Sequence, residues 1–485
     1  MKVTLCCETQ IIFKMAATKS KVTKKENGWK TKAKLRGKQN KLHVMALKRA
    51  KESRDDWRRK CKDAQKSQQE VKVKGHHYSL ELMTLATLLN ITYNISLRAT
   101  SKALRSFSLA YGRQAKKISA GSIRNWGLRL GLYFLTRPLP PGRYALIADE
   151  SISMGQEKLL VLLVARLDND NAGRTAPLQM LDVEVLHVQS KPSWKGADIS
   201  ALIQQKTGEG PGIDLAYAIS DKGSNLKNAF KLSGLKWVGD CTHLVSNCTQ
   251  ALFQNDAQLN GLVKAMNATR AKWALSHLAV YAPPALRKKA RFHQIFAVYK
   301  WADTILGKWE LLPQKAKDEL GYVVKNRELV QTMKQIHCLV EDFSHLVKGK
   351  GINSCTERQW VQKYGERLRQ WKEEQACVDG KVGKYHAAIL EFIAQTRASL
   401  PQEYQVLCCS DIIESIFGKY KNKGGSSMIT DDALKIAAYP HDIQKEDIAK
   451  AMAVKTTKCL QMWKQENTTV SLLAQRKAFK KKVAA

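Results

Sequence analysis

The chain has 485 residues, enough for two to four domains, and its hydrophobic content of 44% allows sizeable buried cores. Lys and Arg number 81 against 43 Asp and Glu, a net charge of +38, and a surplus of this size indicates a polyanionic partner. No apolar run approaches the roughly 18–20 residues that span a bilayer. The eleven cysteines form no CxxC pair, which argues against a zinc finger or a disulfide framework and for reduced, intracellular thiols. We therefore favour nucleic acid as the partner, with a ribosomal or merely basic protein as the alternative.

Residues 1–77 are predicted to form a basic helical arm. Residues 1–75 hold 23 Lys and Arg against 7 Asp and Glu, and they contain no proline. Helix formers dominate from Lys30 to Lys72. The arm is expected to attract phosphates without reading sequence. A solvated, unstructured basic segment is the alternative.

Residues 78–137 are predicted to form a compact three-helix unit. The expected helices are Leu80–Leu89, Leu97–Tyr111 and a third that begins at Ser119 or Ser122 and runs through Leu132.

The third helix of this unit is expected to carry apolar side chains on one side and polar side chains elsewhere. Its apolar residues, including Trp126, share one side and are expected in the core, whereas Arg124, Asn125 and Arg129 lie off that side. This pattern predicts a helix-turn-helix-like DNA-binding domain in which the three polar side chains contact DNA. An ordinary helical packing domain is the alternative.

Residues 138–243 change to a strand pattern after the boundary at Pro138–Gly142. Five segments rich in Val, Leu and Ile predict strands: Arg143–Ala148, Lys158–Arg166, Leu181–Gln189, Leu215–Ser220 and Lys236–Gly239. Helices are expected at Lys195–Lys206 and Ser224–Leu232. The fourth strand is nearly continuously apolar, which fits a buried position inside the sheet.

Residues 244–401 lose the strand pattern and are predicted to be an all-helical insertion. Tryptophan at helical spacing is more often a core residue than a base-stacking one, so we expect these side chains in the core: Trp273, Trp301, Trp309, Trp360 and Trp371. Residues 402–430 are expected to return to the sheet on a helix, and residues 431–485 to form a helical, basic C-terminal tail.

Three acidic residues lie where their side chains can be held rigidly. Asp149 ends the first strand, Asp221 follows the fourth strand, and Glu414 lies on an amphipathic helical run within Ser410–Lys423. Two strands and a helix can bring three carboxylates around a pair of divalent ions. Mg²⁺ prefers such hard oxygen ligands. The alternatives are a solvated strand end, a helix cap and a charged stripe on a surface helix.

Three further side chains accompany these acids. Asp240 and His243 are three residues apart and become neighbours if a helix starts there, and Lys421 lies two turns after Glu414. A helix cap with a buried histidine is the alternative for Asp240 and His243.

The order and context of these segments resemble the catalytic core of DDE transposases of the bacterial insertion-sequence type. The quoted segments are YALIADE, LAYAISDKG, VGDCTH (matching a C/DxxH motif) and SDIIESIFGKYKNK. The resemblance covers about residues 80–425. One large group of these enzymes carries Tyr and Arg upstream of the Glu, where this chain has Leu407 and Ser410. The implied fold class is multidomain α plus α/β: an N-terminal helical DNA-binding region and a ribonuclease-H-like mixed sheet interrupted by the helical insertion.

The resemblance also implies an activity and a site. Asp149, Asp221 and Glu414 would be catalytic and would bind two Mg²⁺ (or Mn²⁺) ions, while Asp240, His243 and Lys421 would support the metal site or contact DNA. The enzyme would cleave the ends of a mobile element and join them to target DNA.

The implied partners are the terminal inverted repeats of the element and target DNA, bound by a homodimer or larger assembly. The implied location is the cytoplasm at the nucleoid, or the nucleus in a eukaryotic host. Two other functions stay open, a transposase-derived DNA-binding regulator and a structure-specific nuclease on the same fold.

Overall fold

The computed structural model describes residues 29–67, 73–110, 118–152, 157–167, 176–208, 212–285, 295–399, 405–422, 429–470 and 472–483. The chain divides into two compact units, Met1–Val71 and Lys72–Ala485.

The first unit contains one long helix, α2 (Trp29–Ser67). Its 39 residues give a length of about 58 Å at the helical rise of 1.5 Å per residue. The predicted helical arm is confirmed for this range, while residues 1–28 and 68–72 lie outside the described residues. Large apolar side chains of α2, such as Leu42 and Trp57, are exposed, so basic and apolar groups alike face solvent. Among the described residues, no helix is long and apolar enough to cross a membrane.

The second unit is built on one mixed sheet of five strands in the order β3-β2-β1-β4-β5. The strands are β1 (Gly142–Ile152), β2 (Lys158–Arg166), β3 (Val183–Lys191), β4 (Ile213–Ser220) and β5 (Trp237–Gly239). Strands β1, β2 and β3 pair antiparallel, and β4 runs parallel to both β1 and β5. All five predicted strands are present, and β4 lies inside the sheet as its apolar sequence predicted.

The two faces of the sheet bury different side chains because neighbours along a strand point in opposite directions. Leu146 and Ala148 of β1 pack in a cluster with side chains of α6 (Gly196–Gly208) and α7 (Ser224–Leu232). Ala145 and Ile147 belong instead to the large core on the opposite face. Residues 149 and 221 continue the alternation that faces this larger core.

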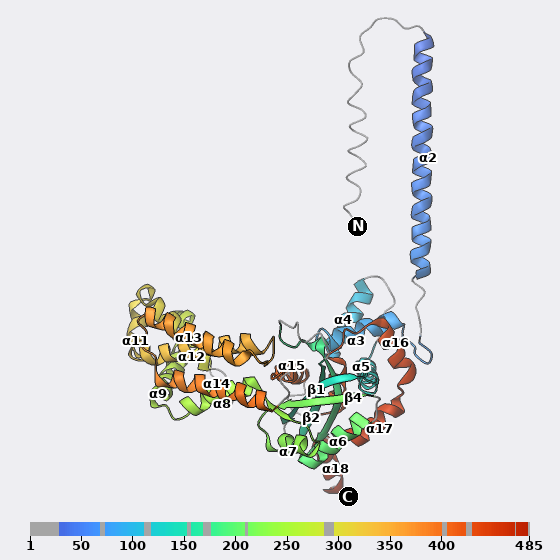
Figure 1. Cartoon of the computed structure of the whole chain (residues 1–485). Coiled ribbons are helices and arrows are strands. Elements are labelled where there is room, and N and C mark those ends of the chain that lie inside the picture. The colour runs from blue at the N-terminus through green and yellow to red at the C-terminus, as the bar shows by residue number, and fades with distance from the viewer. Residues whose placement is uncertain are drawn as a thin grey trace. The chain divides into compact units, whose positions relative to one another are not determined.

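The segment between β5 and the last sheet-associated helix is helical throughout its described residues. Its α-helices are α8 (Cys241–Phe253), α9 (Ala257–Trp273), α10 (Ile295–Gly307), α11 (Gln314–Lys325), α12 (Arg327–Val347), α13 (Thr356–Glu373) and α14 (Gly380–Ala398). Figure 1 shows them gathered beside the sheet. Trp273, Trp360 and Trp371 are buried, and Trp301 and Trp309 pack against the same core. The expectation that these tryptophans are core residues is confirmed.

The chain then returns to the sheet through a short extended segment. A bridge pairs Ile352 with Val406, and α15 (Asp411–Tyr420) follows. Helix α15 packs against β1 through an apolar side that includes Ile413 and Phe417.

The N-terminal and C-terminal helices pack together, an arrangement that the sequence analysis did not predict. The N-terminal helices are α3 (Leu80–Ile91), α4 (Leu97–Ala110) and α5 (Ala120–Leu135); the C-terminal elements are η7 (Asp431–Ala438), α16 (Lys445–Val454), α17 (Thr457–Asn467) and α18 (Leu472–Val483). Helix α5 contacts η7, α16 and α17 as well as α3 and α4. It begins at Ser119, whose side chain caps its first turn.

Gly131 is where α5 and η7 approach most closely. A Cβ atom at this position would clash with the backbone carbonyl of Leu434, so only glycine allows the contact. We expect Gly131→Ala to lower the free energy of unfolding by about 2–3 kcal/mol through overpacking. Urea unfolding measures this change. The control is Gly121→Ala on the same helix, where the nearest atom would be 3.6 Å away and a gain of up to about 1 kcal/mol is expected. If the two substitutions changed the free energy of unfolding equally, the close contact between Gly131 and Leu434 would be contradicted.

Candidate metal and DNA site

The strand register sets Asp149 and Asp221 side by side. Ile147 of β1 pairs with Ile219 of β4 in the parallel ladder, and each aspartate lies two residues further along its own strand direction. Because side chains alternate between faces with a period of two, both carboxylates project to the face that carries α15. The predicted pairing of two strand-end acids therefore has a geometric basis in this sheet.

The backbone around each aspartate fixes its carboxylate. The N–H of Glu150 donates to Asp149 Oδ1 at 2.7 Å, and the N–H of Gly223 donates to Asp221 Oδ1 at 2.8 Å. Glu150, the acidic neighbour of Asp149, is instead engaged with Lys158 on β2, with Nζ to Oε2 at 2.9 Å. Glu150 is thus held by an ion pair of its own.

Helix α15 is joined to the sheet by backbone hydrogen bonds from the segment that precedes it. The N–H of Leu407 donates to the hydroxyl of Tyr217 on β4 at 2.8 Å. The N–H of Cys241 donates to the carbonyl of Cys408 at 2.7 Å. The N–H of Ser410 donates to Asp240 Oδ1 at 3.1 Å. These contacts fix the start of the helix that carries Glu414.

The first residue of α15 adds side-chain contacts to the helical segment. The Thr242 hydroxyl donates to Asp411 Oδ1 at 2.6 Å, and Lys348 forms an ion pair with the same carboxylate. Burial opposes the ionisation of Asp411, but hydrogen bonds from Lys348 and Thr242 outweigh it and hold the pKa of this carboxyl below its usual value. Asp411 is therefore a structural anion, and the exposed Glu414 one turn later is free to face the site.

The charges of two predicted acids act on the third, Asp149. Burial raises the pKa of Asp149 to about 7. The hydrogen bond from Glu150 and the charge of His243 oppose this rise, whereas the negative charges of Asp221 and Glu414 add to it. A like charge that raises a pKa must lie near the group it acts on, so Asp221 and Glu414 lie near Asp149. Such crowding is the condition that a bound cation relieves.

The buried Asp240 and the half-buried His243 form a pair next to these acids. Asp240 caps α8, accepting from the N–H groups of Thr242 and His243, and its Oδ2 lies 2.6 Å from Nδ1 of His243. The hydrogen bond to Asp240 raises the pKa of His243 to about 9, and burial acts in the opposite direction. The charges of Glu414 and Asp221 also favour the imidazolium. His243 is thus a positive charge held beside the acids.

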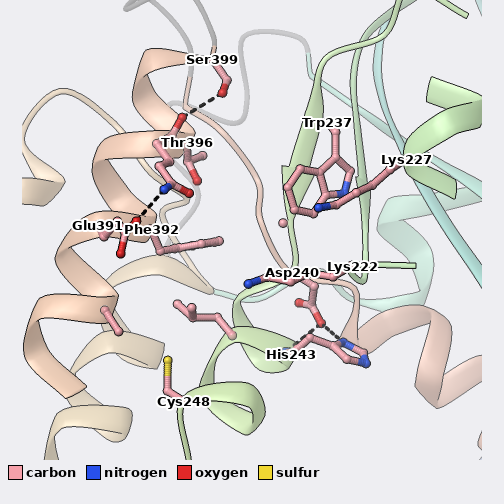
Figure 2. Close-up of a pocket in the computed structure, with 14 residues that line it drawn as sticks. Lys222, Lys227, Trp237, Asp240, His243, Cys248, Glu391, Phe392, Thr396 and Ser399 are labelled. Atoms are coloured by element: carbon pink, nitrogen blue, oxygen red, sulfur yellow. Dashed lines mark hydrogen bonds and ion pairs between the residues drawn. The ribbon is translucent and has the colours of Figure 1, made fainter. Parts of the chain in front are cut away.

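A pocket of about 380 Å³ opens next to the Asp240–His243 pair. It lies between α14 on one side and the ends of β4 and β5 on the other, and Figure 2 shows the Asp240–His243 pair in its wall. Lys222 and Lys227 line it, and Nζ of Lys227 lies 3.8 Å from the centre of the Trp237 ring. The pocket therefore presents positive charge and an aromatic ring close to the acids. Sequence reasoning missed it because its walls come from distant parts of the chain.

Of the three α5 side chains that were predicted to contact DNA, two bind other residues of the protein and one is exposed. Arg124 forms ion pairs with Asp431 and Asp432, and Arg129 donates to the hydroxyl of Thr457 at 3.1 Å. Asn125 is exposed. Both arginines thus join α5 to the C-terminal elements.

Lys421 was predicted to support the metal site or contact DNA, and it is exposed at the end of α15. Its Nζ lies 5.7 Å from the centre of the Phe417 ring.

Within the described residues, one group of three metal-ligating side chains has all its ligand atoms within 4.8 Å of one another: Asp240, Cys241 and Cys409. Asp149, Asp221 and Glu414 do not form such a group. Simultaneous ligation of one ion by the three acids therefore needs their carboxylates to move closer together than they lie in this structure. The sequence signal for the other group is the pair of adjacent cysteines, Cys408 and Cys409.

The raised pKa of Asp149 has a consequence for stability. The pKa of the Asp149 carboxyl rises from 3.8 to about 7 on folding. The unfolded chain therefore loses this proton more easily than the folded protein does. As a result, the carboxyl lowers the free energy of unfolding increasingly between pH 3.8 and 7, and by its full amount above pH 7. We expect Asp149→Asn to raise the free energy of unfolding by about 2 kcal/mol at pH 8 and by less at pH 5. Urea unfolding at the two pH values measures it. Asp214→Asn, at an exposed site on β4, is the control and should change stability by less than about 0.5 kcal/mol. Destabilisation by Asp149→Asn at pH 8 would contradict the crowding.

Compared with known proteins, the chain matches no protein-family model and no curated protein.

Proposed function

We propose that the protein is a DDE-type DNA transposase that cleaves element ends and transfers the cut strands into target DNA by divalent-metal chemistry. One observation carries the proposal. The parallel register of β1 and β4 sets Asp149 and Asp221 at adjacent positions on one face, and the charge of Glu414 on α15 acts on Asp149 from the same side. The five-stranded mixed sheet is compatible with the ribonuclease-H-like core that the resemblance implies.

The three acids fit a hard divalent ion by their chemistry. Carboxylate oxygens are the ligands that Mg²⁺ and Mn²⁺ take in proteins, and the raised pKa of Asp149 indicates negative charge that a cation would stabilise. Asp149, Asp221 and Glu414 would hold the ions. When bound, a pair of such ions supplies an activated water or hydroxyl and stabilises the leaving oxygen in phosphoryl transfer.

The neighbouring residues position the acids and the substrate. Asp240 fixes the start of α15 through Ser410 and holds His243 as an imidazolium. In this proposal the positive His243 approaches a phosphate next to the acids. Lys222 and Lys227 at the adjacent pocket would hold the DNA backbone as further phosphate ligands.

The net charge of +38 supports a nucleic-acid substrate. Helix α2 holds 15 Lys and Arg against 4 Asp and Glu, and such a surface binds phosphates through counterion release and without sequence readout. The DNA would thus be attracted over a wide surface and cut at one place.

The test uses the DNA that flanks the coding region. The full-length protein is incubated with labelled fragments of both flanks and Mg²⁺ or Mn²⁺, and the products are resolved on sequencing gels. We expect cuts at the borders of an inverted repeat, free 3′-hydroxyl ends, and joined products when target DNA is added. EDTA should abolish them.

Two outcomes would overturn the proposal. Salt-sensitive binding of the fragments without any metal-dependent cut would identify a DNA-binding regulator. Cutting that ignores the flanking sequence and yields no joined product would identify a nuclease.

A further inference from the structure

Two cysteines and an aspartate from distant parts of the chain meet where α15 joins α8. Sγ of Cys241, Sγ of Cys409 and a carboxylate oxygen of Asp240 all lie within 4.8 Å of one another. We propose that this thiol–carboxylate cluster (Asp240, Cys241 and Cys409) binds a borderline-soft divalent ion of the Zn²⁺ class. This site is separate from the acids at the strand ends, and the proposal stands whether or not the chain cuts DNA.

The backbone around the thiol–carboxylate cluster is already fixed. Cys241 is the first residue of α8, and its N–H donates to the carbonyl of Cys408 at 2.7 Å. The N–H of Ser410 donates to Asp240 at 3.1 Å. The residues on both sides of Cys409 are thus bonded to the segment that supplies the other two ligands, so an ion meets a preorganised site.

The donor set matches zinc chemistry. Zn²⁺ takes thiolate and carboxylate ligands and binds three protein ligands with water in a fourth position. Asp240 is buried, with 0% of its side chain exposed, and is oriented by Thr242, His243 and Ser410. Each oxygen of this carboxylate accepts two contacts in the structure, so an ion would take the place of one of these donors.

Metal binding at the cluster would be coupled to proton release. Cysteine binds Zn²⁺ as the thiolate, so an ion would replace the thiol protons of Cys241 and Cys409, which leave to solvent. The affinity for the ion would therefore rise with pH.

A small cavity reaches one member of the thiol–carboxylate cluster, Cys409. It has a volume of about 30 Å³ and is also lined by Cys408, Lys348 and Asp411, which is room for one water molecule. Lys348 lies in an ion pair with Asp411, so its charge is balanced there.

An ion in this place would tie the two parts of the chain that flank the helical segment. Cys241 precedes that segment and Cys409 follows it. Glu414 lies five residues beyond Cys409, so the ion would hold in place the helix that carries it. The thiolate ligands would select a Zn²⁺-class ion over Mg²⁺, because Mg²⁺ prefers oxygen ligands such as those at the strand ends.

Cobalt titration of the full-length protein tests the proposal. Co²⁺ replaces Zn²⁺ in such sites, and thiolate ligands give a charge-transfer absorption in the near ultraviolet that oxygen ligands do not give. We expect one equivalent of Co²⁺ to produce this band and one equivalent of Zn²⁺ to remove it. Cys241→Ser and Cys409→Ser should each weaken Co²⁺ binding by about 100-fold or more.

Two controls make the titration specific. Cys248→Ser changes a half-buried thiol on the same helix and should keep the band. Glu414→Gln should also keep it, which separates this site from the acids. If Cys241→Ser, at a buried position, fails to fold, Cys409→Ser at a half-buried position carries the test. Absence of the band in the folded wild-type protein, or its persistence at unchanged affinity in Cys409→Ser, would overturn the proposal.

Discussion

Glu414→Gln is expected to lower the rate of metal-dependent DNA cleavage by about three orders of magnitude or more, while DNA affinity stays within about twofold. The glutamine keeps the size of the side chain but removes the negative charge that a divalent ion needs. Because Glu414 is exposed on α15, the folded structure should tolerate the change. Single-turnover cleavage of labelled flanking DNA measures the rate, and a filter-binding titration measures the affinity.

A second acid provides the matched control for Glu414. Glu391→Gln removes one negative charge from α14, in the pocket beside Asp240 and His243. This change should leave the cleavage rate within about threefold because Glu391 is not among the three acids. A Glu414→Gln variant that cleaves as fast as the wild type, or a Glu391→Gln variant that is equally inactive, would contradict the assignment.

Asp240→Asn is expected to lower the free energy of unfolding by about 2–3 kcal/mol at pH 7, because it removes a buried charge that accepts several hydrogen bonds and pairs with the partly exposed His243. The carboxylate has 0% of its side chain exposed. An asparagine supplies one acceptor oxygen in place of two, so donors from Thr242, His243 and Ser410 compete for it. Urea unfolding measures the loss.

The same change also alters the pH dependence of stability. His243 has a folded pKa of about 9, raised from 6.5 by its hydrogen bond to Asp240. A raised histidine pKa gives stability that is complete below pH 6.5 and is lost as the pH rises through 9. The wild type should therefore become less stable between pH 6.5 and 9, and Asp240→Asn should lose most of this slope. NMR titration of His243 should show its pKa falling towards 6.5 in the variant.

Asp379→Asn is the control for the cap function of Asp240. Asp379 caps α14 through the N–H of Lys381 at 2.8 Å, and asparagine caps helices about as well as aspartate. We expect a change near zero. A loss at Asp240 no larger than at Asp379 would show that Asp240 acts only as a cap.

Most elements of the sheet unit follow from local sequence. Apolar runs such as Lys158–Arg166 match β2 residue for residue, and the serine before α5 caps it as expected. Hydrophobic periodicity and turn residues are local signals, so they predict elements well. The two strand-end aspartates could also be predicted, because an acidic residue directly after a run of apolar residues is a local sequence pattern.

Long-range packing was not predictable in the same way. The ion pairs of Arg124 with Asp431 and Asp432 join residues about 300 positions apart. No local sequence pattern predicts such a pair. The sequence analysis placed residues 431–485 in a separate tail, whereas the structure packs η7 and α16 against α5. A close helix contact depends on one residue, Gly131, whose neighbour is known only from the fold.

The thiol–carboxylate cluster was missed for a related reason. Zinc motifs are recognised by short spacings between ligands, but Cys241 and Cys409 are separated by the whole helical segment between β5 and α15. Backbone and side-chain hydrogen bonds between residues 240–242 and 408–411 bring them together. Likewise, the electrostatic link between Asp149 and Glu414 required the packing of α15 on β1.

Anomalous diffraction from crystals soaked in Mn²⁺ tests the central claim most directly. The account predicts manganese density bounded by the carboxylates of Asp149, Asp221 and Glu414, with Glu414 turned towards the two aspartates, and loss of that density in Glu414→Gln. Manganese density elsewhere, with the three carboxylates pointing away from one another, would contradict the account.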